Sequence, residues 1–236
     1  TSLVKEHQII VVKINYRLGP MGWFTHPGIQ DFATGMDKSS NFGTLDIIEA
    51  LRWVKKNIRS FGGNPENITI FGESAGGHNV LTLLASPASN GLFHKAISQS
   101  GYTSSFATIE ALGIDSEGKI INALGSDSIL SQHNPSSYKN IKNAYLENPE
   151  KNADQYQKYL RSIDGKELFE TYKLIADKTF DRIPLATRDG VVIPLQGIQA
   201  SLGDPKNNKN IPVIAGSNKD ELSLWLGANR YFVNAS

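Results

Sequence analysis

A serine between two strongly patterned segments constrains the fold more than any other feature of this sequence. The run from Ile68 to Phe71 is typical of a buried strand, and the apolar run that follows Gly76 is typical of a helix. Between them lies the segment Gly72-Glu73-Ser74-Ala75-Gly76. A strand that turns sharply into a helix around a serine is a nucleophile elbow, which holds the hydroxyl above the sheet in strained backbone.

The residues of this elbow have distinct expected roles. Ser74 is the predicted nucleophile, and Gly72 and Gly76 are expected to keep side chains out of crowded backbone around it. A helix that begins at Ala75 directs unpaired N–H groups toward the site. The Ala75 N–H is therefore expected to be one donor of an oxyanion hole.

The rest of the chain predicts alternating strands and helices. An amphipathic helix is predicted from Thr44 to just before Gly62-Gly63, because Ile47, Leu51 and Val54 recur at helical spacing. Strands that alternate with helices pair in parallel through right-handed crossovers. The prediction is an α/β-hydrolase fold, with a mostly parallel central sheet flanked by helices. Besides the strand at Ile68–Phe71, strands are predicted at Ile9–Asn15, Lys95–Gln99 and Ile211–Ala215.

Residues 103–180 differ in composition, being richer in Asn, Ser, Lys and Glu. They predict a helical insertion or cap over the site, with helices around Ser116–Ala123, Tyr156–Ile163 and Lys166–Lys178. The whole chain, residues 1–236, is then interpreted as part of one α/β-hydrolase domain. Elsewhere, Gly28–Asn41 predicts a surface loop, and Asp189-Gly190 is a hairpin signal.

Composition excludes several classes of function. The 24 basic and 23 acidic residues nearly balance, which gives no electrostatic reason to expect nucleic acid or an anionic membrane as a partner. There is no cysteine, so disulfides, thiol nucleophiles and Cys-ligated zinc are excluded. We see neither a signal peptide nor a membrane-spanning run in the sequence, and the compartment stays open.

A serine nucleophile needs an imidazole base and a carboxylate that orients it. In this fold the acid follows the serine along the chain and the histidine follows the acid. Asp220 and Glu221 come after a late strand; Glu221 is the candidate and Asp220 its rival, although acids at a helix N-terminus explain both equally well.

None of the histidines occupies the expected position of the base, because all of them precede Glu221. His78 lies four residues beyond Ser74 and is interpreted as a packing or hydrogen-bonding residue. His26 and His94 are interpreted as loop or surface residues. The five histidines are His7, His26, His78, His94 and His133.

Four blocks resemble the type-B carboxylesterase/cholinesterase family. They are NYRLGPMGWF (15–24), NFGTLDIIEALRWVKKNIRSFGGNPENITIFGESAGG (41–77), LFHKAISQSG (92–101) and IPVIAGSNKDE (211–221). The resemblance implies a Ser-Glu-His triad in which Ser74 is the nucleophile, Glu221 rather than Asp220 is the acid, and Ala75 supplies an oxyanion N–H. It also implies a buried structural salt bridge between Arg17 and Asp46, whereas Asn79 departs from the family's usual small hydroxyl residue.

Two elements of that family are absent from the sequence. The glycine-rich His-Gly-Gly oxyanion loop is expected upstream of Ile9, and the triad histidine downstream of Glu221. We therefore expect an internal, incomplete portion of the fold that needs the remaining N- and C-terminal segments of the same polypeptide.

The function implied is hydrolysis of small-molecule carboxylic esters through an acyl-enzyme, without a metal or other cofactor. The alternative is an esterase-like domain that binds a partner protein and no longer catalyses, and thioesterase, lipase or amidase activity also stays open. Apolar lining of the site is expected from Phe24, Tyr102, Phe106 and Trp225.

Overall fold

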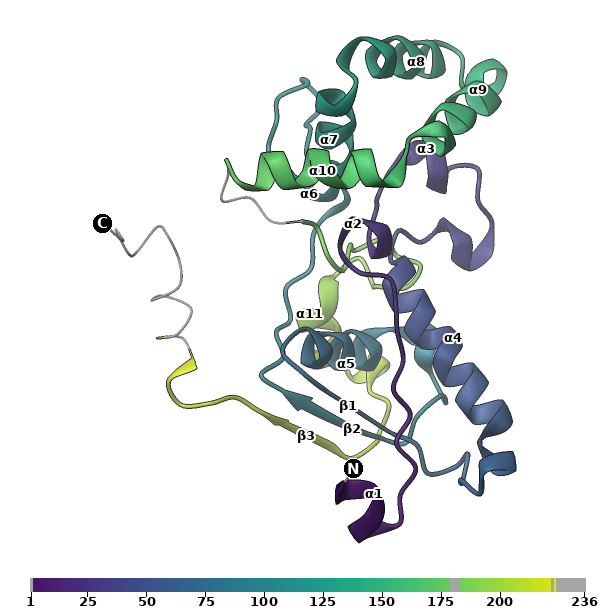
Figure 1. The fold of residues 1–236 in the computed structure, drawn as a ribbon, viewed down its shortest axis with the longest axis vertical. Coiled ribbons are helices and arrows are strands. Elements are labelled where there is room, and N and C mark those ends of the chain that lie inside the picture. Colours follow the sequence, from purple (N-terminus) through teal and green to yellow (C-terminus); the bar gives the residue numbers. More distant parts are fainter. Residues whose placement is uncertain (1, 179–182, 222, 224–236) are drawn as a thin grey trace.

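The computed structural model describes residues 2–178, 183–221 and 223. A three-stranded parallel sheet lies at the centre of its α/β part, in the order β1-β2-β3 (Figure 1). The strands are β1 (Thr69–Glu73), β2 (Lys95–Gln99) and β3 (Val213–Gly216). The predicted parallel pairing is confirmed, with Gly72 opposite Ser98 and Ile97 opposite Ile214.

Helices pack on β1 and β2 and enclose the core, whereas all residues of β3 are exposed. Helix α5 (Ala75–Ala85) packs on β1 and β2, and both α4 (Phe42–Asn57) and α11 (Gly197–Gly203) contact α5. The fully or almost fully buried core includes Ile48 of α4, Leu83 of α5 and Ile198 of α11. This arrangement is the predicted α/β-hydrolase architecture, a parallel sheet flanked by helices.

Helix α4 follows the predicted amphipathic pattern. Ile47, Leu51 and Val54 are buried, whereas Glu49 and Arg52 on the other face are exposed. The helix tightens into the 3-10 turn η2 (Ile58–Phe61) and stops at Gly62, whose positive φ of 81° is favourable for glycine.

A second group of helices gathers at the end of the molecule away from α1 (Ser2–His7) (Figure 1). Its core is formed by Leu130, Tyr138, Tyr145 and Tyr156, with Leu124, Ile129 and Tyr172 beside them. The helices are α6 (Thr108–Leu112), α7 (Ser126–His133), α8 (Pro135–Glu147), α9 (Pro149–Ser162) and α10 (Gly165–Ala176). We refer to α6–α10 as the helical lobe.

The sequence predicts only part of this lobe. Helices α9 and α10 cover two of the three predicted segments, but Ser116–Ala123 is not helical and instead contains a turn and a bridge between Ile114 and Ile120. Helices α6, α7 and α8 were not predicted. The Asn134-Pro135 pair was a sequence signal for the start of α8. In the structure Asn134 is the N-cap, whose side chain accepts the Ser137 N–H, and Pro135 is the first helical residue.

The predicted strand at Ile9–Asn15 does not form in the structure. Ile9, Ile10, Val12 and Ile14 are each 38–45% exposed, and the segment pairs with no strand in the described part of the chain. A β-strand forms only where its backbone pairs with a neighbouring strand, so an apolar run alone does not predict a strand. Short helices follow it at α2 (Gly19–Gly22) and α3 (Pro27–Gln30).

The hairpin expected at Asp189-Gly190 is also wrong. The Asp189 carboxylate accepts bonds from the backbone N–H groups of residues 191, 192 and 193, which curl the chain around it. It also binds Ser39 Oγ, the Ser40 N–H and Asn41 Nδ2. The end of the predicted Gly28–Asn41 surface loop is therefore buried, and its first part holds α3 and the 3-10 turn η1 (Gly35–Lys38).

Among the described helices, none combines the length and apolar character needed to cross a membrane.

Candidate active site

Ser74 lies at the turn between β1 and α5. Its backbone has φ 55° and ψ −114°, a strained conformation for a residue with a side chain. The turn is held from both sides, since the Ser74 N–H donates to Gln99 O at 2.9 Å and Ser74 O accepts the His78 N–H at 2.9 Å. Ser74 itself is partly exposed. These contacts give the geometry expected of a nucleophile elbow.

Two glycines allow the close approach of backbone at this turn, but only one of them was expected. A Cβ on Gly72 would lie 2.8 Å from Gly76 Cα, and a Cβ on Gly77 would lie 2.6 Å from Gln99 O. A Cβ on Gly76 would meet nothing within 4 Å among the described residues, so the crowding expected at Gly76 is wrong. The Gly76-Gly77 doublet was the available signal for the second close approach.

Ala75 is the first residue of α5 and is exposed, and Glu73 beside it at the end of β1 is exposed too. The first N–H groups of a helix have no partner within the helix, and they attract negative charge. The start of α5 therefore favours negative charge next to Ser74.

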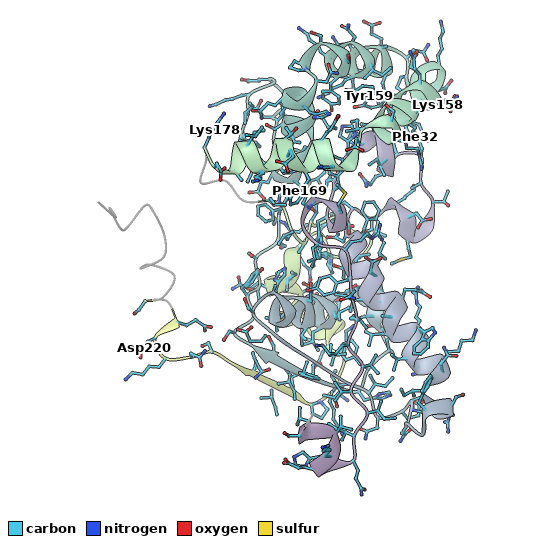
Figure 2. The ribbon with its side chains drawn as sticks, in the orientation of Figure 1. Phe32, Lys158, Tyr159, Phe169, Lys178 and Asp220 are labelled. Carbon is cyan, nitrogen blue, oxygen red and sulfur yellow. The ribbon has the colours of Figure 1, made fainter. Side chains whose placement is uncertain are left out.

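Glu221 lies beyond the carboxyl end of β3, as Ser74 lies beyond that of β1. The Asn218 N–H donates to Glu221 Oε2 at 3.3 Å. Figure 2 shows the neighbouring Asp220 standing apart from the helices and the rest of the sheet. Within the described residues, no hydrogen bond joins the side chains of Ser74 and Glu221.

His78 matches its interpretation as a packing and hydrogen-bonding residue. It is 3% exposed, and its Nδ1 lies 2.7 Å from Tyr102 O. Burial lowers the pKa of its imidazole, partly offset by the bond to Tyr102 O. The ring of Tyr102 stacks on it, and the adjacent Asn79 is buried.

His26 lies in the loop before α3, as interpreted, but it is completely buried rather than at the surface. Its Nε2 lies 2.8 Å from the hydroxyl oxygen of Tyr138, and its Nδ1 accepts the Gly28 N–H at 3.2 Å. Burial lowers the pKa of His26 to about 4. Tyr138 lies 112 positions along the chain, so no local pattern could have indicated this contact.

Two of the other described histidines also have structural contacts. His94 Nδ1 accepts the Ile68 N–H at 3.1 Å, and His133 Nδ1 lies 2.9 Å from Thr171 Oγ1. His7 ends the exposed helix α1. In the part of the chain that the structure describes, no histidine side chain bonds to the side chain of Ser74 or Glu221.

Arg17 and Asp46 form the expected ion pair, but it is not buried. Arg17 Nη2 lies 2.7 Å from Asp46 Oδ1, and the side chains are 52% and 27% exposed. The Arg17 Nε and backbone N–H both donate to Asp46 Oδ2, so the pair fastens the segment before α2 to α4. Arg17 holds the pKa of the Asp46 carboxyl below its ordinary value.

Of the residues expected to line the site, Tyr102 is exposed and Phe106 is partly buried in a bridge to Thr187. Phe24 packs instead against the core of the helical lobe, and Trp225 lies outside the described residues. No cluster of three or more His, Cys, Asp or Glu suited to a metal ion occurs among the described residues.

Comparison with known proteins gives one consistent family. The family model described as "Carboxylesterase family" matches residues 1–232. The para-nitrobenzyl esterase of Bacillus subtilis is 45% identical over 130 residues, which are 51% of this chain and 25% of that protein. The cocaine esterase of Homo sapiens is 54% identical over 101 residues, 43% of this chain and 17% of that protein.

Solved structures agree with the sequence comparisons. The carboxylesterase EST55 of Geobacillus stearothermophilus superposes with a TM-score of 0.73 at 31% identity, covering 98% of this chain and 41% of that one. A structure titled PNB esterase gives a TM-score of 0.65 at 27% identity, covering 94% of this chain and 38% of that one. The chain therefore spans well under half the length of these relatives.

Proposed function

This chain belongs to the carboxylesterase family, and on that premise we propose that the protein hydrolyses small-molecule carboxylic esters through an acyl-enzyme formed on Ser74. The observation that most supports this proposal is the strained backbone of Ser74, with φ 55°, between β1 and α5. Ser74 is also partly exposed. Strain of this kind costs free energy and is typical of functional sites.

In the proposed mechanism the Ser74 hydroxyl attacks the ester carbonyl while a histidine takes its proton. The Ala75 N–H donates to the oxygen that becomes negatively charged. The histidine gives this proton to the alcohol as it leaves. Water, with the same histidine as base, then attacks the acyl-enzyme, which releases the carboxylic acid and restores the Ser74 hydroxyl. No step requires a metal or another cofactor.

We propose that the base is a histidine outside these 236 residues and that Glu221 orients it. The side chain of each described histidine except His7 bonds to a group other than the Ser74 side chain. The carboxyl ends of β1 and β3 point the same way, which puts Ser74 and Glu221 beyond one edge of the sheet. The remaining N- and C-terminal segments of the polypeptide are then needed to complete the site.

We propose that residues 103–180 are a helical insertion within the same domain. What supports this is their attachment to the N-terminal part of the chain: α9 packs on α3, and Tyr138 and Tyr156 enclose His26. The sheet resumes with β3 after this excursion.

The test uses the full-length protein and p-nitrophenyl esters of rising acyl length. Ser74→Ala should reduce kcat by several orders of magnitude, and Glu221→Gln by about 10²–10⁴, because the base loses its orienting charge. Asp220→Asn is the matched control and should stay close to wild type.

Two outcomes would contradict the assignments. Equal losses from Glu221→Gln and Asp220→Asn would refute the choice of acid. Undiminished hydrolysis by Ser74→Ala would refute the nucleophile, and a wild-type protein without hydrolysis of any ester would favour the non-catalytic binding domain.

A further inference from the structure

His78 and Tyr102 form a stacked pair beside the nucleophile. Their ring centroids are 4.2 Å apart, and the ring planes differ by 12°. His78 Nδ1 donates to the backbone oxygen of Tyr102 at 2.7 Å, so one histidine holds both the ring and the main chain of the tyrosine. His78 is 3% exposed and Tyr102 is 41% exposed, which leaves part of the phenol ring open to solvent.

The pair lies close to Ser74 for two independent reasons. Ser74 is the N-cap of α5, outside the regular helix, and its backbone oxygen accepts the His78 N–H at 2.9 Å. Tyr102 follows β2, whose last residue, Gln99, accepts the N–H of Ser74. A Cβ on Gly77 would lie 2.9 Å from Gly101 Cα, so the helix and the segment before Tyr102 are in direct backbone contact.

We propose that Tyr102 is a specificity-determining residue of the ester site, favouring esters that carry a planar aromatic ring, and that His78 is the positioning residue that holds it. The inference rests on the proposed esterase function and adds the class of substrate. It assigns a flat aromatic surface next to the backbone that holds the nucleophile, where a group attached to the ester carbonyl or its oxygen would contact it.

The chemistry of the pair suits this role. An aromatic ring prefers another ring in an offset or edge-on arrangement over a saturated group of the same size. Burial lowers the pKa of His78, so the imidazole is neutral at neutral pH and does not attract water to the stack. The Nε2 of His78 is buried and has no hydrogen-bond partner among the described residues, and the face of the ring stacks on Tyr102.

The first test compares matched esters with the full-length protein. Benzyl acetate and cyclohexylmethyl acetate differ only in the ring of the alcohol, and ethyl benzoate and ethyl cyclohexanecarboxylate only in the ring of the acyl group. In at least one pair, the wild type should show a kcat/KM about three- to tenfold higher for the aromatic ester. Tyr102→Leu should abolish this ratio, whereas Tyr102→Phe, which keeps the ring, should preserve it.

The second test separates positioning from folding. His78→Phe keeps a flat ring and removes the unpaired nitrogen, so it should retain most of the aromatic preference; His78→Leu should lose it while still hydrolysing the cyclohexyl esters. A ratio near one in both wild-type pairs, or a ratio unchanged by Tyr102→Leu, would overturn this inference but leave the esterase assignment intact. No hydrolysis of any of the four esters would refute the proposed function itself.

Discussion

Acidification should weaken the attachment of the helical lobe through one buried histidine, His26. Its Nε2–H donates to the Tyr138 oxygen, whose hydroxyl in turn donates to the Asp127 carboxylate. Its Nδ1 already accepts the Gly28 N–H at 3.2 Å, so a proton added there would face another donor. The neutral imidazole therefore fits this site and the charged form does not.

The pKa of His26 gives the expected magnitude. Burial lowers it from 6.5 to about 4, with Asp127 raising it and Lys142 lowering it by smaller amounts. Between these two values the unfolded chain binds a proton that the folded chain does not, so stability falls as the pH falls. Linkage gives a loss of about 2 kcal/mol between pH 7 and pH 5 from this one group.

The assay compares full-length wild type with His26→Asn. Asparagine can accept the Gly28 N–H at this helix start, where it is a favoured residue, but it does not titrate. Urea unfolding at pH 7 and pH 5 should show that the wild type loses about 2 kcal/mol more than the variant. The same loss in both proteins would refute the reasoning.

Four further substitutions test contacts at the elbow and elsewhere in the fold. Gly77→Ala should lower the free energy of unfolding by about 1–3 kcal/mol, because the new Cβ would lie 2.6 Å from Gln99 O. Gly76→Ala is the control and should change it far less, because its Cβ would enter open space. Asp189→Ala should cost about 3 kcal/mol or more, because several donors lose their acceptor together. Asp46→Asn should cost about 1 kcal/mol or less, because its pair with Arg17 is half-exposed.

Denaturant midpoints of the full-length variants check all three expectations. Equal midpoints for the two glycine variants would contradict the close approach at residue 77. A wild-type midpoint for Asp189→Ala would show that its hydrogen bonds contribute nothing net, and a loss at Asp46 as large as that at Asp189 would contradict the role of exposure.

Local sequence patterns predicted the elements that position the site. The strand Lys95–Gln99 has the predicted bounds, and the apolar spacing of Ile47, Leu51 and Val54 predicted the buried face of α4. The turn at Ser74 was readable because its strand, glycines and helix are contiguous in sequence. Periodicity and turn chemistry act over a few residues, and these features lie within that range.

Features that depend on distant partners were missed. His26 is buried by Tyr138 and Tyr156, which lie on helices far along the chain. The bonds from Asp189 to residues 39–41 span about 150 positions, and nothing near Asp189 distinguishes them from a hairpin turn. An apolar run such as Ile9–Asn15 becomes a strand only beside a partner, and its own residues do not supply one.

The central claim is that the hydroxyl of Ser74 becomes acylated. The most direct measurement is peptide mass mapping of the full-length protein after incubation with a fluorophosphonate, alongside ester hydrolysis of the same sample. We expect one adduct, on the peptide that contains Ser74, with hydrolysis lost in proportion to labelling. An adduct on another residue, or full inhibition with Ser74 unmodified, would contradict it.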